Sequence, residues 1–500
     1  MTEENHLRLR RAKSAAGVED MQGQEYRNRR WQPDKPCHKH RDSLFSWSSG
    51  FDNFTGFVNW AFLLLFMGGT RLFLENLLKY GILVDPEQWL IVLTGRQEGE
   101  AEHPSLYLLT YAFVPVIFAL VIEKSLAHDI IPETLGVYIQ ILNILIVIVT
   151  PMISVHIYSN KFSLMGASTV CFIYSVMFLK LWSYVQVNLW CRHARNQDIN
   201  KRLGRRQSMS ASDVTAEPNH NNNVKGEDQK DHSSEESVTS TPPQLVEYPD
   251  NLKLKDILYF FCAPTVCYEL NFPRTDRIRK RFLIKRLLEL LVGLQVLASL
   301  FQQWIIPSVK NSLIPFSNMD VIKATERLLK LSIPNHLIWL IFFYLFFHSL
   351  LNLTGEVLHF ADRNFYADWW NADNTDTFWR NWNMPIHQWA VRHLYKPLIE
   401  QGYSKMTATT SVFFISAFMH EYLVSVPLRT YKIWAFMGMM GQIPLSMISN
   451  HVHKKYGAKW GNIIVWSSLI LGQPLCIMMY YHDFVITHFG EALLDRFGHA

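Results

Sequence analysis

Apolar stretches long enough to cross a lipid bilayer recur along most of this chain. A membrane helix needs about 20 mostly apolar residues, because its backbone polar groups must be satisfied within the helix. Only 18% of the 500 residues are charged and 14% are aromatic, which argues against an ordinary soluble protein. We therefore predict an all-α fold, a polytopic bundle of about nine membrane helices. The expected spans lie near residues 57–78, 105–123, 135–158, 162–187, 286–306, 334–354, 407–427, 432–450 and 462–484.

Composition divides the chain into segments of different character. The N-terminal tail is basic and polar, and a low-complexity stretch near 196–245 is rich in Ser, Asn and charged residues. Such stretches have too few apolar groups to offset chain entropy, so we expect disorder there. The expected organisation is a disordered tail at 1–50, four membrane helices at 51–187, a low-complexity linker at 188–250, a catalytic core at 251–490 containing a loop at 355–406, and a C-terminal tail at 491–500.

Basic side chains predict how the chain is oriented. Arginines and lysines crowd the N-terminal tail and two further segments, 192–206 and 277–286. Under the positive-inside rule all three are cytoplasmic. Four expected spans separate the tail from the segment at 192–206, so spans and charges agree. An odd total number of spans then places the C-terminus on the lumenal side.

A histidine and a glutamate, His420 and Glu421, stand inside an otherwise apolar stretch. Ionisable groups in hydrocarbon are costly and usually face a cavity, a partner or a reaction. On a helix His420 shares its face with small or apolar neighbours, Ser416 among them. Burial favours a neutral imidazole, which suits a general base. A structural histidine bonded to a neighbouring helix is the alternative. Glu421 is rotated about 100° away, so we expect it to pair elsewhere.

The loop at 355–406 carries the second unusual string, which runs from Phe365 to Asn371 and reads FYADWWN. Trp and Tyr favour the membrane interface, so the loop is expected to form amphipathic helices in the headgroup layer. The amides of Asn371, Asn381 and Asn383 are candidates to bind substrate or an oxyanion. The alternative is that the string only anchors the loop in the interface. Asp368 has no neighbours that complete a metal site.

Further polar groups lie in the predicted spans of the C-terminal half, and together they favour a polar-lined internal chamber. Any single one is also explained by a helix-to-helix hydrogen bond. The six cysteines are scattered and are expected to be reduced. The polar groups concerned are His336, His348, Asn352, Gln442, Gln473, His482 and Asp483.

The FYADWWN string and the later intramembrane histidine resemble those of the membrane-bound O-acyltransferases. More narrowly they resemble the branch that holds the type 1 diacylglycerol O-acyltransferases and the sterol O-acyltransferases. The likeness covers most of the chain and leaves out the tails and the stretch near 196–245. Strings similar to the diacylglycerol enzymes occur at 71–77, 79–86, 267–274, 334–340 and 420–429.

The resemblance implies a fold of that family's type, with the membrane helices around a reaction chamber. It implies that His420 takes the proton from the free hydroxyl of diacylglycerol while that oxygen attacks the thioester of acyl-CoA. Asn383 resembles the family's second catalytic polar position. The implied substrate contacts are Trp382, His387, Lys405, Ser416, Gln442 and Gln473, and the motif residues are Phe365, Tyr366, Asp368, Trp369, Trp370 and Asn371.

The resemblance also implies the partners of the protein: acyl-CoA, diacylglycerol from the bilayer, surrounding membrane lipids, and a second copy or more in a dimer or tetramer. It places the protein in the endoplasmic reticulum membrane. Neither cofactor nor metal is expected, because acyl-CoA is a substrate, and nucleic acid is not expected as a partner.

Two other functions remain open at this point. A sterol O-acyltransferase shares the string and the histidine, although the residues at 426–429 and 472–474 look more like the diacylglycerol branch. A membrane transporter would also line a path with polar residues. Transporters are often built from inverted repeats, and the chain shows no internal repeat.

Overall fold

The computed structural model describes residues 55–87, 104–159, 161–213, 245–313 and 320–489, together with residues 89, 315 and 318. Over these residues the regular structure is helical, and a single isolated bridge joins Arg274 to Phe360. The predicted all-α fold is confirmed. The chain divides into two units, of which the first ends at Gly81 and contributes helix α2 (Thr55–Tyr80).

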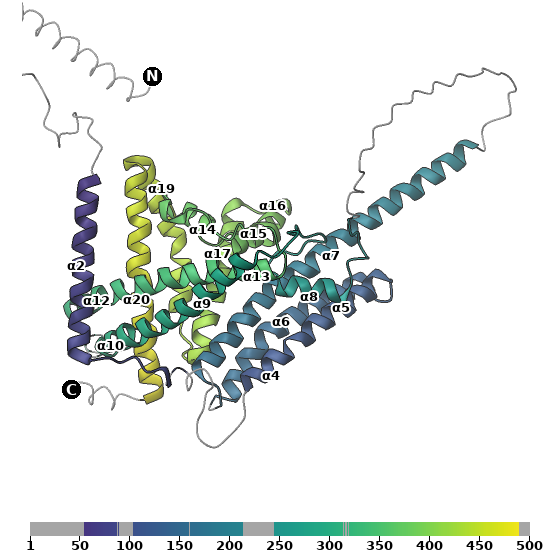
Figure 1. The fold of residues 1–500 in the computed structure, drawn as a ribbon. Coiled ribbons are helices and arrows are strands. Elements are labelled where there is room, and N and C mark those ends of the chain that lie inside the picture. The colour runs from purple at the N-terminus through teal and green to yellow at the C-terminus, as the bar shows by residue number, and fades with distance from the viewer. Residues whose placement is uncertain are drawn as a thin grey trace, which may run out of the picture. The chain divides into compact units, whose positions relative to one another are not determined.

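The second unit, from Ile82 onward, holds the remaining helices (Figure 1). Three π-helical turns, η1, η2 and η4, interrupt its longer helices. In chain order the elements are α4 (Pro104–Tyr111), α5 (Phe113–Ala127), α6 (Glu133–Ile157), α7 (Leu164–Asp213), α8 (Leu254–Cys262), α9 (Lys280–Leu300), η1 (Phe301–Ile305), α10 (Ile306–Lys310), α12 (Val321–Phe343), η2 (Tyr344–Leu350), α13 (Leu351–Val357), η3 (Trp369–Asn371), α14 (Thr375–Trp382), α15 (Met384–Ala390), η4 (Val391–Tyr395), α16 (Lys396–Glu400), α17 (Lys405–Leu428), α18 (Trp434–Met440), α19 (Gln442–Tyr456) and α20 (Ala458–Phe489).

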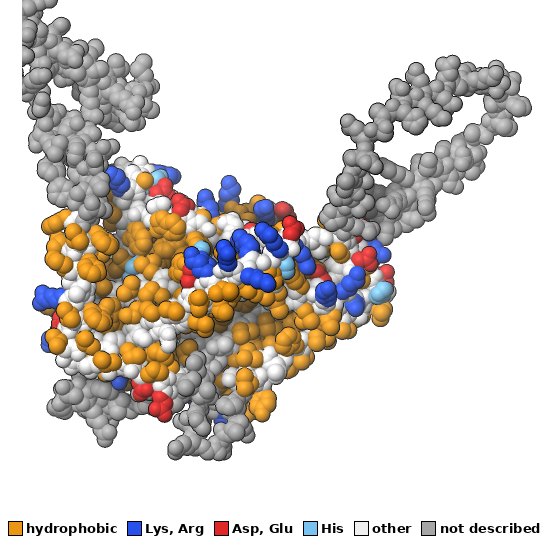
Figure 2. All heavy atoms as spheres, viewed as in Figure 1, with side chains coloured by type: hydrophobic (Ala, Val, Ile, Leu, Met, Phe, Trp, Pro, Cys, Tyr) orange, Lys and Arg blue, Asp and Glu red, His pale blue; other side chains and the backbone are white. Residues whose placement is uncertain are grey.

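Among the described residues, seven helical stretches are long and apolar enough to cross a membrane. They are Trp60–Tyr80, Pro104–Ala127, Glu133–Ile157, Leu164–Gln197, Val321–Val357, Lys405–Leu428 and Ala458–Thr487. Hydrophobic side chains accordingly cover much of the face seen in Figure 2.

The expected number of nine spans is not confirmed, because the stretches near 286–306 and 432–450 are not among the seven. The first corresponds to α9, whose opening turns are strongly basic, followed by η1 with Gln302 and Gln303. The second is divided at Gly441 into α18, of 7 residues, and α19, of 15 residues. Helices α18 and α19 are each shorter than the roughly 20 residues that a span requires.

Helix α7 continues well beyond its membrane span and ends at Asp213. Residues 196–213, which belong to the stretch where disorder was expected, continue this helix. Extending an anchored helix needs no new nucleus, and Lys, Arg, Gln and Leu favour the helical state. The rest of the linker up to residue 244, the tail at 1–50 with Cys37, and the tail at 491–500 lie outside the described residues.

A first packed core joins α5, α6, α7 and α8 to α17. Tyr174 and Tyr184 of α7, Phe260 of α8 and Tyr422 of α17 are all nearly or fully buried in it. The cluster places α17, the helix of His420, against the scaffold built by the early spans.

Three buried charged side chains, Lys180, Arg192 and Glu123, reinforce this scaffold. The ammonium of Lys180 donates to the carbonyls of Phe260, Phe261 and Ala263 at 2.9, 2.9 and 2.8 Å, which satisfies acceptors at the C-terminus of α8. Arg192 donates to Glu123 at 3.0 Å, and both side chains are buried. Buried charges are tolerated only when they are paired in this way.

A second core, which we call the aromatic cluster, joins α12, η2, η3, α14 and α20. Its members are Trp339, Phe343, Phe347, Trp369, Phe378, Trp382 and Trp466. The loop at 355–406 does form short helices, but its tryptophans are not all interfacial anchors. Trp369 and Trp389 are each only 2% exposed, because they pack inward, whereas Trp370 is 45% exposed.

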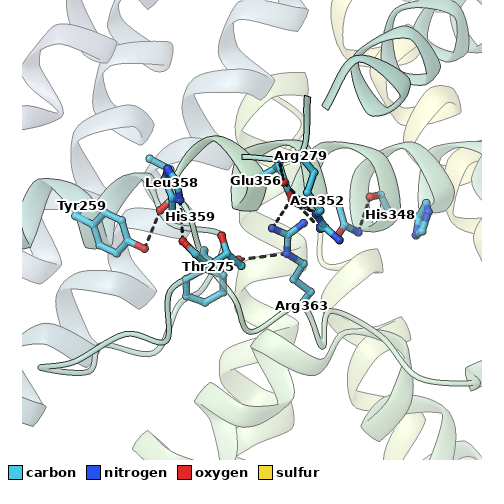
Figure 3. A network of polar contacts seen from close by, with 10 residues as sticks. Tyr259, Thr275, Arg279, His348, Asn352, Glu356, Leu358, His359 and Arg363 are labelled. Atoms are coloured by element: carbon cyan, nitrogen blue, oxygen red, sulfur yellow. Dashed lines mark hydrogen bonds and ion pairs between the residues drawn. The ribbon is translucent and has the colours of Figure 1, made fainter. Parts of the chain in front are cut away.

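A buried carboxylate fixes the start of α9 to the end of α13. Glu356 is fully buried and lies between the guanidinium groups of Arg279 and Arg363, at 2.8 and 2.7 Å (Figure 3). It also accepts the backbone N–H of Arg279 at 2.5 Å. Removing both arginines would leave the buried Glu356 carboxylate unpaired, which is destabilising.

The first turn of α20 approaches the chain that follows the FYADWWN string. Asn462 donates to the carbonyls of Trp370 and Ala372 at 3.2 and 2.7 Å. A Cβ atom added at Gly461 would lie 1.8 Å from the carbonyl oxygen of Asp373. Only glycine permits this close approach between α20 and the loop.

We predict that Gly461→Ala lowers the stability of the folded protein by about 2–3 kcal/mol, because the new methyl group collides with backbone. The measurement is thermal unfolding of the detergent-solubilised protein. The matched control is Gly472→Ala on the same helix, where nothing lies within 4 Å of the added Cβ. Equal melting temperatures for the two variants would contradict the proposed packing.

Candidate active site

The ring of His420 is held in one tautomer by its own helix. Its Nδ1 lies 2.7 Å from the carbonyl oxygen of Ser416, one turn earlier on α17. A carbonyl oxygen only accepts, so Nδ1 carries the proton and Nε2 holds the lone pair. Ser416, predicted to contact substrate, accepts this hydrogen bond through its backbone carbonyl. The arrangement directs the basic nitrogen away from the helix backbone.

The other faces of α17 are occupied by structural contacts. Glu421, rotated about 100° from His420, accepts the N–H of Phe436 in α18 at 2.9 Å and the hydroxyl of Tyr480 in α20 at 2.6 Å. It also accepts a hydrogen bond from Ser425. Tyr422, rotated about 200°, lies in the first core. Glu421 therefore fixes the helix, as expected, and the face of His420 is left for another use.

Helices α14 and α19 lie on the side of α17 that carries His420. Phe413, two turns before His420 on the same face, meets the ring of Trp379 edge-on with centroids 6.4 Å apart. The indole of Trp379 donates to Gln442 of α19 at 3.3 Å. Gln442, predicted to contact substrate, is thereby brought to the helix face that bears the histidine.

The His420 side chain is exposed on the surface of the folded chain. The imidazole is therefore accessible to a bound molecule. No hydrogen-bond partner is found for Nε2 among the described residues, so this nitrogen is free to accept a proton from a bound molecule.

Asn383 occupies the junction between α14 and α15. Its side-chain oxygen accepts the N–H of Ile386 at 3.2 Å and so caps the N-terminus of α15. Its amide NH₂ group has no partner in the part of the chain that the structure describes. A polar donor is therefore available there, held in place by the cap.

The FYADWWN string holds this junction through its backbone. Ala367 donates to the carbonyl of Asn381 at 2.8 Å, and Met384 donates to the carbonyl of Phe365 at 3.1 Å. These two bonds lie on either side of Asn383. Tyr366 lies between Phe365 and Ala367 in the string, and its hydroxyl is hydrogen-bonded to Nδ1 of His348 at 2.9 Å. This bond connects the string to η2.

The remaining side chains of the string are mainly structural. Phe365 is buried beside Phe360, and Trp369 lies inside the aromatic cluster. Asp368 accepts from the amide of Asn381 at 3.4 Å. Asn371 closes a short turn by donating its backbone N–H to the carbonyl of Asp368 at 3.0 Å.

The other predicted site residues are spread over the bundle. Trp382 stacks on Trp339 with ring centroids 5.3 Å apart, so packing occupies one of its faces. Lys405 is exposed at the first position of α17, about 22 Å along the helix from His420. Gln473 accepts from Asn335 at 3.4 Å and links α20 to α12.

His387 lies on α15, one turn from Asn383. Burial, with a smaller contribution from Arg380, lowers the pKa of His387. The imidazole is therefore mostly neutral near pH 7 and would meet a ligand as a hydrogen-bonding group, not as a cation.

His393 is a buried histidine that the sequence reading did not single out. Its Nδ1 donates to Gln186 at 2.8 Å, and its Nε2 accepts from the hydroxyl of Ser183 at 2.8 Å, since that hydroxyl oxygen already receives the N–H of Tyr268. Burial, together with Arg392, lowers the pKa of His393 to about 3. Both nitrogens are used, so His393 serves the structure, in contrast to His420.

Over the described residues, no group of three or more His, Cys, Asp or Glu side chains has the arrangement of a metal site. Five cysteines are free thiols in the same part of the chain: Cys171, Cys191, Cys262, Cys267 and Cys476.

We predict that Tyr366→Phe lowers kcat for the reaction of this site about fivefold, the equivalent of one lost hydrogen bond in the support of Asn383. The ring remains against Phe343, so the melting temperature should change little. Tyr259→Phe is the matched control, because it loses a comparable bond to the carbonyl of Leu358 at 3.1 Å, away from Asn383. Equal kcat losses in the two variants would contradict a positioning role.

Comparison with known proteins shows to which family the chain belongs. The model of the membrane-bound O-acyltransferase family, MBOAT, matches residues 134–482. Diacylglycerol O-acyltransferase 1 of Bos taurus is 45% identical over 91% of this chain and 86% of its own length. The protein of that name in Homo sapiens is 44% identical over 91% and 85%. Diacylglycerol O-acyltransferase 1B of Glycine max is 34% identical over 91% and 82%. With its membrane-spanning helices and these similarities, the chain belongs to the membrane-bound O-acyltransferase family of multi-pass membrane proteins.

Proposed function

We propose that this protein is an acyl-CoA:diacylglycerol O-acyltransferase that makes triacylglycerol and free CoA. The relatives that match over most of its length are named as diacylglycerol enzymes, which favours diacylglycerol over a sterol as the acceptor. The observation that carries the mechanism is the free Nε2 of His420, with Nδ1 bound to the carbonyl of Ser416.

The reaction proceeds by direct transfer. Nε2 of His420 takes the proton of the free hydroxyl as that oxygen bonds to the thioester carbon of acyl-CoA. The carbon–sulfur bond then breaks, and the CoA thiolate takes the proton from the imidazolium. The products are triacylglycerol, CoA and neutral His420, so no acyl-enzyme is required. The amide of Asn383 donates a hydrogen bond to the carbonyl oxygen as negative charge develops on it.

The substrates enter from different sides. Acyl-CoA is an elongated anion, and Lys405, on the exposed first turn of α17, contacts its nucleotide end while the thioester lies near His420. His387 and Trp382 border the path between them. Diacylglycerol enters from the bilayer on the side of α17 where Phe413 contacts Trp379 of α14 and Trp379 contacts Gln442 of α19. Gln473 contributes to the acceptor side of the site.

The proposed setting is the endoplasmic reticulum membrane, with the N-terminus cytoplasmic and the C-terminus lumenal. The fourth membrane-spanning stretch, Leu164–Gln197, ends within the basic segment at 192–206, in agreement with the charge rule. We also propose that the protein assembles as a homo-oligomer, a dimer or tetramer.

His420→Ala is expected to lower kcat for triacylglycerol formation by about 10²–10⁴, the contribution typical of a general base. The assay uses labelled oleoyl-CoA with diacylglycerol or cholesterol and purified full-length protein. The melting temperature serves as the test of folding. Glu421→Gln is the adjacent control and should lower stability more than kcat, because it weakens contacts to α18 and α20. Wild-type activity in a folded His420→Ala protein would contradict the mechanism, and cholesteryl ester as the main product would contradict the acceptor.

Asn383 permits a test that separates its two roles. Asn383→Asp keeps an oxygen that can cap α15 but lacks the NH₂ donor, whereas Asn383→Ala lacks both. We expect both variants to lose about 10²–10³ in kcat, with stability lowered mainly in the alanine variant. Full activity of Asn383→Asp would show that the residue is only a helix cap.

A further inference from the structure

A dense set of exposed cations precedes and opens helix α9. The side chains of Arg274, Arg277, Arg279, Lys280, Arg281 and Lys285 are all exposed. Asp276 is the one acidic residue between positions 274 and 285. Figure 2 shows Lys and Arg side chains gathered beside a hydrophobic band, in the region where α9 and α13 meet in Figure 1.

Two of these cations are engaged within the protein. Arg279 is paired with the buried Glu356, as Figure 3 shows, and the guanidinium of Arg274 lies 4.2 Å from the ring centroid of Tyr259. The other four form what we call the basic stripe, Arg277, Lys280, Arg281 and Lys285. They have no acidic partner among the described residues. Because Glu356 fixes the backbone at Arg279, the stripe is displayed from a rigid position.

The stripe continues directly into an apolar face of the same helix. Arg281, Lys285, Leu288 and Val292 follow at the helical spacing of four, three and four residues, so they lie on one side of α9. Leu288 and Val292 are 56% and 59% exposed, which in a membrane protein means contact with acyl chains. Cations at one end of an exposed apolar face mark the level of the lipid headgroups.

We propose that the basic stripe, together with this apolar face, binds anionic phospholipids of the leaflet that it faces. The phosphate and any further headgroup anion meet Arg277, Lys280, Arg281 and Lys285, while the acyl chains lie along Leu288 and Val292. A soluble anion would use only the charged half of this surface. The exposed apolar half therefore favours a bilayer lipid as the occupant.

Each cation near an anionic surface contributes about fivefold to affinity. We therefore expect the triple variant Arg277→Gln, Arg281→Gln, Lys285→Gln to bind phosphatidylserine at least tenfold more weakly than the wild type. The substitutions leave Arg279, Arg274 and the buried Arg286 intact, so the fold at the start of α9 is retained. High salt should reduce wild-type binding as well.

The experiment reconstitutes the full-length protein into vesicles of phosphatidylcholine with a minority of phosphatidylserine. The protein is then extracted with a polymer that retains its surrounding lipids, and the two lipids are quantified. Enrichment of phosphatidylserine around the wild type and its loss in the triple variant would support the proposal. The matched control is Lys454→Gln, Lys455→Gln, Lys459→Gln, three exposed cations outside the stripe, which should leave the enrichment in place.

Three results would overturn the proposal. They are no enrichment of phosphatidylserine around the wild type, an equal loss of enrichment in the control variant, or full competition by free glycerophosphoserine, which lacks acyl chains.

A fourth test concerns the substrate. In vesicles of phosphatidylcholine alone, the triple variant should keep the wild-type KM for acyl-CoA. A large rise in that KM would assign the stripe to the substrate instead. The lipid measurement does not require turnover, so it stands or fails separately from the proposed acyl transfer.

Discussion

The packing of α17 on two of its sides is the constraint on which the proposed site depends. Tyr422 buries one side in the scaffold of the early spans, and Glu421 ties a second side to α18 and α20. An intramembrane helix held in this way cannot rotate to bury its histidine elsewhere. The exposed polar group of His420 is thus kept on the remaining side, where it would be costly in a membrane unless a substrate or water met it.

A second support holds the amide of Asn383 in place at the junction between α14 and α15. The backbone of the FYADWWN string forms hydrogen bonds to the chain on both sides of Asn383. The aromatic cluster packs around Trp369 of the string, and α20 approaches the residues just after the string at Gly461. The string is therefore more a structural element than a set of substrate contacts. Its unusual composition follows from this role, since large rings fill the space between α12, α14 and α20.

The sequence predicted the features that depend on local pattern. Apolar length gave the helical membrane fold, and the isolated polar pair at 420–421 marked the helix that carries the candidate base. Features set by distant contacts were missed. Nothing near His393 in the chain reveals that Ser183 and Gln186 occupy both its nitrogens, and nothing near Trp369 reveals its burial. The spans near 286–306 and 432–450 were not confirmed, and for the second of them hydropathy does not reveal a break such as Gly441.

The most direct measurement is a structure of the full-length protein with an unreactive thioether analogue of acyl-CoA and with diacylglycerol. We expect the free hydroxyl of diacylglycerol about 3 Å from Nε2 of His420, with Nδ1 still bound to the carbonyl of Ser416. The amide of Asn383 should face the position of the reacting carbonyl. A hydroxyl bound elsewhere, with Nε2 of His420 directed at protein atoms, would contradict the role of this histidine as the base.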